Sequence, residues 1–532
     1  MYLKMIIIIV FFMFTACNET DNYRETNRSM DISISSSIDS YMIKKIENVD
    51  SINIELDDST REVYLLFTNT EKNSKKHNSN QNKKTYTQHA SQHILDFNHQ
   101  YIHKNNFKNN SIEKNSEKPL NLDHSRFYLE KDLSLSTQAT RKKQLKNIST
   151  KYGNKTLNVW VSDDSFGEEC SKSYCVTQEM VDALADRFLK KGEDNDIYDW
   201  VSNIFGEEWS DTSNSALIDN NNEITILITD IDNDNRTSGA VLGYFYAKDN
   251  YKKSLFQGSN EQIMFYIDSV LLAKHKDNEE WSIENYQTKK VLSTLAHEFS
   301  HMIHFYQKNI LYKTDGLQPW IDEMLAVSIE DIIATKLQTT GLRGVSPNRG
   351  DAGEDDNSHG NFPLFNRNIN LTLPIWNNQR RDYSKVSAFG SYLIRNYGGA
   401  KLLHDILHNK YTDESAIVEA VKQTPNGEDK DFDTLIQDWG IAILLSSTTE
   451  LDPDSGYLYN LGDFLEDEYK NSTYSMGSIN FFKYYTKPNV TTKAHNTMPK
   501  SNLYYKLDTK STKNITIKID QNPNIKTTLV IK

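Results

Sequence analysis

Two histidines and a glutamate stand at a spacing that suits metal chemistry. His297 and His301 are four residues apart, so on a helix they lie one turn above the other and can bind one metal ion. Glu298 follows the first histidine, where it could receive a proton from a water molecule on that ion. The pattern His-Glu-x-x-His therefore predicts a metal site with His297 and His301 as ligands and Glu298 as a proton acceptor.

A catalytic zinc ion takes three protein ligands and keeps one position open, so a third ligand must come from elsewhere. A histidine ten positions after His297 is one solution, but Gln307 stands there. His304 would lie about 10 Å from His297 along the helix axis, too far to complete the same coordination sphere. We expect His304 to pack in the core or to lie behind the ligands.

Glu323 is the better candidate for the third ligand. It lies in a second helical stretch that begins at Pro319, a residue suited to the first helical turn. On this helix Glu323 shares a side with the small Ala326, which would let the two helices approach closely. Asp322 and Glu330 are its rivals in the same stretch.

The first of these helices has its own sequence support. Residues 283–308 carry an apolar stripe at intervals of three and four residues, which is typical of a helix with one buried face. This stripe would turn the histidine edge toward a cleft. Its members are Val291, Leu292, Leu295, Phe299, Met302, Ile303 and Tyr306.

The surrounding pattern runs from strands to helices and back to strands. Alternating or β-rich apolar runs predict strands at 52–56, 63–67, 157–161, 224–228, 242–246, 263–267 and 515–519. Helical spacing predicts helices at 177–189, 385–397, 400–409, 414–422 and 431–447. We therefore predict an α+β fold with a mixed sheet and active-site helices.

The two helical motifs together resemble a known group of enzymes, the gluzincin metallopeptidases. With the upstream stretches at 228–232 and 242–245, the chain is similar to the hyicolysin family of secreted bacterial peptidases over residues 150–445. The residues that carry the likeness are His297-Glu298-x-x-His301 and Trp320-x-x-Glu323-x-x-Ala326. Met324 stands where that family usually has glycine, a difference that bears on how closely the helices pack.

The resemblance implies Zn²⁺ held by His297, His301 and Glu323, and hydrolysis of peptide bonds in extracellular proteins. Glu298 would take the proton of the attacking water and pass it to the leaving amine. The developing oxyanion needs a further donor, which gluzincins supply as a Tyr or His from a later helix. Tyr383 resembles that tyrosine, although Tyr392 and Tyr397 fit the same helix.

The chain begins like an exported protein. Lys4 precedes an apolar run at 5–14, which is too short to span a membrane but typical of a secretory signal. Residues 14–17 resemble a bacterial lipoprotein signal, in which Cys17 is acylated and becomes the new N-terminus. We expect export across the inner membrane and a lipid anchor to a membrane or cell surface, with an ordinary secretory signal as the alternative.

Two weaker patterns follow. Cys170 and Cys175 are close in sequence, and outside the cytosol a disulfide between them is plausible, with free thiols as the alternative. Residues 230–235 place acidic oxygens at alternate positions, which suits Ca²⁺. The glycine of an EF-hand is absent there, so an acidic turn is the simpler interpretation.

Composition limits the other function classes. The 532-residue chain has a net charge of −13, whereas nucleic-acid binders usually carry a basic surplus, so we expect no nucleic-acid partner. Residues 70–125 are nearly core-free and predict a spacer, whose histidines would be weak metal scavengers. The main alternative function is a non-enzymatic surface lipoprotein, an adhesin or an inactive protease-like protein; the oligomeric state has no sequence signal.

These patterns divide the chain into four expected parts. They are a lipoprotein signal peptide at 1–16, a low-complexity spacer with a small β element at 17–150, a zinc metallopeptidase domain at 151–447 and a β-rich region at 448–532.

Overall fold

The computed structural model places most of the chain after residue 122 and several segments before it. Cys17 and nearly all of the expected leader lie outside the described residues. No helix in the described part combines the length and the apolar character that crossing a membrane requires. The described residues are 7–8, 28–34, 41–56, 61–72, 90–100, 123–210, 212–219, 221–276, 279–339, 360–460, 464–484, 487–491, 497–509, 514–519 and 522–532.

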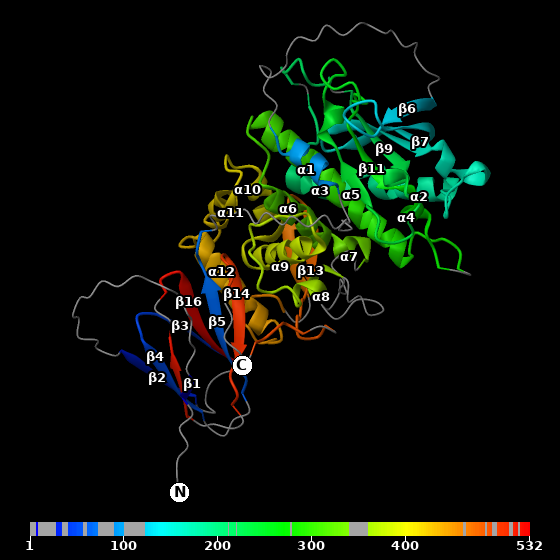
Figure 1. Cartoon of the computed structure of the whole chain (residues 1–532). Coiled ribbons are helices and arrows are strands. Elements are labelled where there is room, and N and C mark those ends of the chain that lie inside the picture. Colours follow the sequence, from blue (N-terminus) through cyan, green and yellow to red (C-terminus); the bar gives the residue numbers. More distant parts are fainter. Residues whose placement is uncertain are drawn as a thin grey trace.

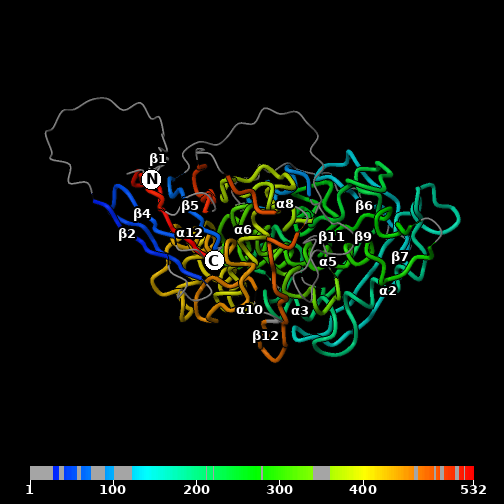
Figure 2. The backbone as a smooth tube through the Cα atoms, turned by 90° about the horizontal axis from the view of Figure 1, so that it is seen from below, coloured from blue at the N-terminus to red at the C-terminus, as the bar shows by residue number. Residues whose placement is uncertain are grey.

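A six-stranded mixed sheet forms one end of the molecule (Figures 1 and 2). Its order is β10-β11-β9-β8-β7-β6, with β8, β9 and β11 parallel and β10 antiparallel at one edge. The strands are β6 (His124–Tyr128), β7 (Ser136–Thr150), β8 (Gly153–Ser162), β9 (Glu223–Thr229), β10 (Gly243–Phe245) and β11 (Met264–Asp268). The sheet thus includes β6 and β7, which lie in the part expected to be a spacer with a small β element, and the expected boundary at residue 150 falls at the end of β7.

Both faces of this sheet are buried, because alternate side chains of each strand point to opposite sides. Val159 of β8 faces the main core, whereas the next residue, Trp160, faces a smaller core that includes Leu95. Leu95 belongs to a short helix in the expected spacer, α1 (Gln92–Asn98). The main core is covered by α2 (Gln178–Phe188), α3 (Ile197–Phe205), α4 (Ser269–Ala273) and α5 (Tyr286–His304).

Three helices carry the predicted metal ligands, the predicted general base and candidate tyrosines. The first, α5, continues as a π-helical turn at Phe305–Leu311, and α6 (Pro319–Ile332) begins with its proline in the first turn. The third, α9 (Arg380–Asn396), packs on α6. At Gly390 of α9 a Cβ would lie 2.2 Å from the Ser328 Oγ and 3.1 Å from the Met324 Cγ. The glycine in α9 therefore gives room for Met324, and the two helices still approach closely.

The remaining helices complete the middle of the molecule (Figure 1). They are α7 (Ala334–Leu337), α8 (Asn361–Phe365), α10 (Gly399–Leu407), α11 (Glu414–Val421) and α12 (Phe432–Leu445), and a hairpin of β12 (Phe464–Tyr469) and β13 (Ser472–Gly477) lies beside them. The mixture of helices and sheets confirms the predicted α+β class.

The two ends of the chain meet in a second β unit, at the opposite end from the six-stranded sheet (Figure 2). One of its sheets has the order β14-β5-β16-β3 and the other β1-β15-β4-β2, so each contains strands from both ends. A separate apolar cluster fills the space between them. The strands are β1 (Ile7–Ile8), β2 (Ser29–Ile34), β3 (Met42–Ile46), β4 (Ser51–Leu56), β5 (Val63–Asn69), β14 (Ser501–Lys506), β15 (Asn514–Lys518) and β16 (Ile525–Ile531).

Candidate active site

The three predicted ligands converge inside the molecule. The Nε2 atoms of His297 and His301 are 3.1 Å apart, and the Glu323 Oε2 lies 3.2 Å from the first and 3.6 Å from the second. Zinc bonds to nitrogen and oxygen ligands are about 2.0–2.2 Å long, so tetrahedral ligand atoms stand roughly 3.3 Å apart. The observed separations suit that geometry.

The chemistry of the donor set also suits a cation. Glu323 is fully buried, and its Oε2 has no hydrogen-bond partner in the described part of the protein. Burial alone would raise the pKa of this carboxyl, but the charges of His301 and His297 outweigh it and hold the pKa well below its usual range. An ionised, buried carboxylate oxygen that accepts no hydrogen bond and faces two imidazole nitrogens fits a metal ion.

Two further carboxylates hold the histidines from behind. Glu330 Oε1 lies 2.7 Å from the His297 Nδ1, and Asp322 Oδ2 lies 3.0 Å from the His301 Nδ1. Such contacts fix the ring orientation and make the opposite nitrogen a better ligand. Asp322 and Glu330, which the sequence left as rivals of Glu323, therefore lie on the far side of the imidazoles from the ligand atoms.

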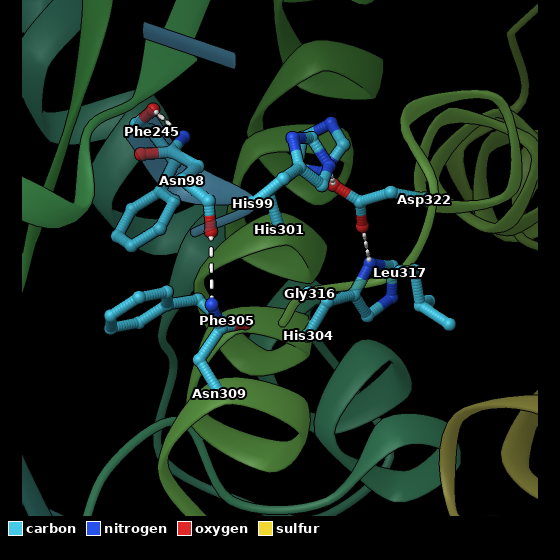
Figure 3. Close-up of a pocket in the computed structure, with 10 residues that line it drawn as sticks. All are labelled: Asn98, His99, Phe245, His301, His304, Phe305, Asn309, Gly316, Leu317 and Asp322. Carbon is cyan, nitrogen blue, oxygen red and sulfur yellow. Dashed lines mark hydrogen bonds and ion pairs between the residues drawn. The ribbon is translucent and has the colours of Figure 1, made fainter. Parts of the chain in front are cut away.

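Asp322 connects two more histidines to the site. Its Oδ1 lies 2.6 Å from the His304 Nδ1, so His304 stands behind the predicted ligands, and its ring packs edge-on against Phe205. Its Oδ2 also lies 2.9 Å from the Nε2 of His99, at the end of α1 (Figure 3). The sequence offers no signal for this contact, because His99 is one of several histidines scattered along the expected spacer.

Glu298 lies against the edge of the six-stranded sheet. Its side chain is 1% exposed, and its Oε2 accepts a hydrogen bond from the Phe245 backbone N–H at 3.0 Å. In an antiparallel pair, successive residues point their backbone groups alternately toward the partner strand and away from it. The Leu242 carbonyl, just before β10, accepts from the Asp268 N–H of β11, so the backbone groups of Phe245, three residues later, face the free edge. The glutamate therefore lies where the free edge of β10 meets the metal ligands.

Of the three candidate tyrosines, Tyr383 is the one at the site. Its hydroxyl oxygen lies 3.1 Å from the Glu323 Oε1 and 3.2 Å from the Asn378 Oδ1, and its one proton can be donated to either acceptor. Burial and the charge of Glu323 raise its pKa well above the usual value, so the phenol keeps its proton. Tyr392 and Tyr397 instead pair with each other, their hydroxyl oxygens 3.2 Å apart.

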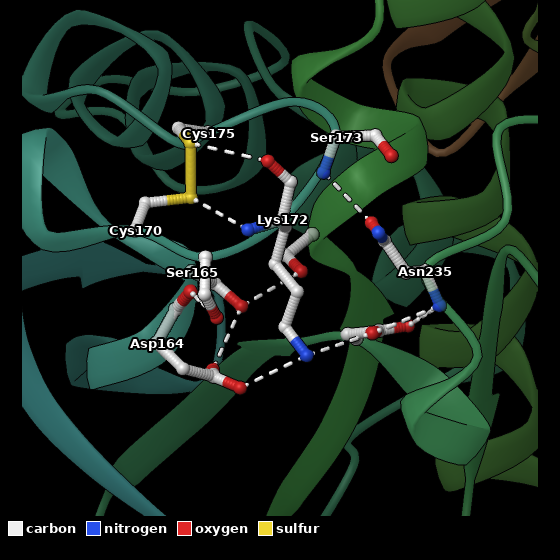
Figure 4. Close-up of a disulfide and its surroundings, with 10 residues drawn as sticks. Asp164, Ser165, Cys170, Lys172, Ser173, Cys175 and Asn235 are labelled. Carbon is white, nitrogen blue, oxygen red and sulfur yellow. Dashed lines mark hydrogen bonds and ion pairs between the residues drawn. A yellow bond between two sulfur atoms is a disulfide. The ribbon is translucent and has the colours of Figure 1, made fainter.

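The two cysteines and the acidic loop at 230–235 lie side by side, and the Ser173 N–H donates to the Asn235 side chain (Figure 4). Cys170 and Cys175 form a disulfide with a Cα–Cα distance of 5.9 Å. Between them, the Lys172 ammonium lies 2.9 Å from the Asp230 carboxylate, which also accepts from the Asn235 N–H at 3.0 Å. A lysine of the protein therefore pairs with Asp230 of the acidic loop, and the possible Ca²⁺ site is not supported.

Comparison with known proteins agrees with the geometry. Residues 137–459, more than half of the chain, match the Peptidase M30 family. The neutral metalloprotease ShpI of Staphylococcus hyicus is 31% identical over 188 residues, a stretch that covers 35% of this chain and 36% of that protein. The chain thus spans about a third of the length of this relative. The matched residues include the predicted zinc ligands, and the chain belongs to the peptidase M30, or hyicolysin, family.

Proposed function

We propose that this protein is a zinc-dependent endopeptidase that hydrolyses peptide bonds of proteins outside the cell. The observation that carries the proposal is the convergence of two imidazole nitrogens and one buried carboxylate oxygen on one point. Membership of the peptidase M30 family supports it.

The roles of the residues follow from their positions. A zinc ion held by His297, His301 and Glu323 would supply Lewis-acid chemistry, which activates water and polarises a carbonyl. Glu298 takes the proton of the attacking water and passes it to the leaving amine. The protonated hydroxyl of Tyr383 donates a hydrogen bond to the oxyanion that develops on the scissile carbonyl.

Glu298→Gln tests the general base. We expect peptide cleavage to fall by about 10²–10⁴-fold, because glutamine cannot accept the proton, while the protein still binds close to one zinc per chain. Glu284→Gln is the matched control, since the Glu284 side chain is 59% exposed and forms ion pairs with Arg187 and Lys289. Unchanged cleavage by Glu298→Gln would refute the assignment, and a zinc-loaded wild type that cleaves nothing would favour the non-enzymatic surface lipoprotein.

We also propose that Cys17 is acylated and anchors the mature protein to a bacterial membrane or cell surface. The support is the charged start, the short apolar run and the residues before Cys17. Labelled fatty acid should be incorporated by the wild type and not by Cys17→Ser. Equal labelling of the two proteins would contradict this.

A further inference from the structure

Residues 90–100, which include α1 and which we call the strap, contact both sides of the candidate active site. At one end the Ala90 carbonyl accepts from the Asn378 side-chain amide at 2.8 Å, and the Asn378 Oδ1 lies 3.2 Å from the Tyr383 hydroxyl. At the other end His99 contacts Asp322 at 2.9 Å, and its carbonyl accepts from the Gly316 N–H at 3.1 Å. The strap thus reaches from the tyrosine to the carboxylate behind His301.

Between these ends, Asn98 occupies the free edge of β10 (Figure 3). Its side-chain amide donates to the Phe245 carbonyl at 2.8 Å, and its Oδ1 accepts from the Ala247 N–H at 2.8 Å. The Phe245 N–H bonds to Glu298 in the same row of backbone groups. An extended peptide that adds a strand to a sheet edge uses this kind of backbone donor and acceptor. Asn98 therefore holds the groups that a peptide beside Glu298 would use.

Apolar packing keeps the strap in place. Leu95 is buried in the small core with Tyr244 and Tyr246 of the β10 region. The Phe97 ring stands edge-on to Tyr246 at 5.3 Å and to Phe256 at 5.1 Å. The strap is therefore docked by a hydrophobic face as well as by hydrogen bonds.

With the strap docked, the reactive groups are enclosed. His297, Glu298, Glu323 and Tyr383 are each at most 1% exposed, and His301 is 7% exposed. An endopeptidase must bring these groups into contact with a polypeptide. The strap also lies outside residues 137–459, which match the family.

We propose that the strap is an intramolecular inhibitor, which occupies the peptide-binding edge of β10 and must leave it before a substrate can bind. This inference rests on the proposed peptidase function. It assigns Asn98 as the residue that blocks the edge, and it identifies the ligand of that edge as an extended polypeptide backbone.

The test compares wild type, Asn98→Ala and Asp96→Ala, each loaded with zinc and checked for equal metal content. Asn98→Ala removes the hydrogen bonds to Phe245 of β10 and to Ala247 just beyond it, so we expect roughly tenfold higher kcat/KM on a peptide and roughly tenfold tighter binding of a peptide hydroxamate, a metal-chelating substrate mimic. Asp96 is exposed on the same helix and bonds to Gln92, so Asp96→Ala should match the wild type in both measurements.

The two measurements separate failure of this proposal from failure of the proposed function. If no variant cleaves a peptide but Asn98→Ala still binds the hydroxamate about tenfold more tightly, the strap blocks the peptide-binding edge and only the peptidase assignment fails. If the wild type cleaves while Asn98→Ala shows equal or weaker cleavage and hydroxamate binding, the strap is a structural part of the site and the inference is overturned. Hydroxamate binding that Asn98→Ala does not improve overturns it in every case.

Discussion

Tyr383 and Glu323 share a hydrogen bond that gives the tyrosine two roles. The phenol donates to one carboxylate oxygen of Glu323, while the other oxygen faces the two histidines. The hydroxyl therefore fixes the rotation of the carboxylate and stays close to the metal ligands. A donor held there can turn toward an oxyanion without being recruited from solvent, which is the arrangement that stabilises a transition state most.

Tyr383→Phe should lower kcat by about 10²–10³-fold with a smaller effect on KM, because the lost hydrogen bond acts mainly on the developing oxyanion. Peptide cleavage kinetics and the zinc content of the purified variant measure the two roles separately. Tyr397→Phe is the matched control, since it also removes a buried hydroxyl but one that pairs with Tyr392. A kcat for Tyr383→Phe close to the wild type would show that another group stabilises the oxyanion.

At the residue scale, the sequence could predict contacts between site residues on one helix, but only some of the contacts between residues on different elements. The four-residue spacing of His297 and His301 predicts a shared metal, and the structure brings them together with Glu323. The assignment of Asp322 and Glu330 depended on which side of each imidazole they approach, which no spacing encodes. His99 was out of reach for the same reason, since its partner Asp322 lies 223 positions away.

At the scale of elements, helices and strands with a strong apolar periodicity were predicted close to their true ranges, whereas those with a weak periodicity were not predicted. The long helix of the histidines, the helix that begins at Pro319 and the apolar strands β9 and β11 lie close to their predicted ranges. The long strand β7 was missed because its side chains are mostly polar and only partly buried. The short helix α1 was missed because its three apolar residues, Ile94, Leu95 and Phe97, stand in a polar stretch, although their spacing suits one buried helical face.

His404 of α10 and His408, the residue that follows α10, bind the last carbonyls of α3. The His404 Nδ1 lies 2.8 Å from the Ile204 carbonyl, and the His408 Nε2 lies 2.8 Å from the Phe205 carbonyl. A helix leaves its last carbonyls without partners inside the helix, so these contacts satisfy two of them. Burial and the neighbouring His404 lower the pKa of His408 to about 4, and burial also lowers the pKa of His404.

The buried position of His408 predicts that the folded protein becomes less stable in acid. Between pH 6.5 and about 4 the unfolded chain binds a proton at His408 that the folded protein excludes, so the free energy of unfolding is highest above pH 6.5 and falls as the pH drops through this window. The loss from this group is at most about 3 kcal/mol.

His408→Gln should shrink that loss, because the glutamine amide can still donate to the Phe205 carbonyl but does not titrate. Urea unfolding at pH 7 and pH 5 measures the difference, and His124→Gln, at an exposed histidine, is the control. An unchanged difference between the two pH values in His408→Gln would mean that other groups cause the acid loss.

At the scale of the whole molecule, the first and last strands depend on each other. In one sheet β5 lies between β14 and β16, and β16 lies between β5 and β3. This β unit rests on α12, where the Asn502 amide donates to the Ile436 carbonyl at 2.8 Å and Gln437 donates to Thr528 at 2.9 Å. Short strand patterns at both ends were visible in the sequence, but their pairing joins residues more than 400 positions apart, which local periodicity does not report.

Leu529→Ala tests this dependence. Leu529 is fully buried in β16, so its truncation should destabilise the β unit by about 2–5 kcal/mol through lost burial and the cavity left behind. Because β16 supports β3 and β5, amide hydrogen exchange should rise at Met42–Ile46 and Val63–Asn69, far away in sequence. Leu133→Ala is the matched control, since Leu133 is 52% exposed and its loss should change stability by less than about 0.5 kcal/mol. If exchange in Leu529→Ala rose only within β16, the strands from the two ends would not form one cooperative unit.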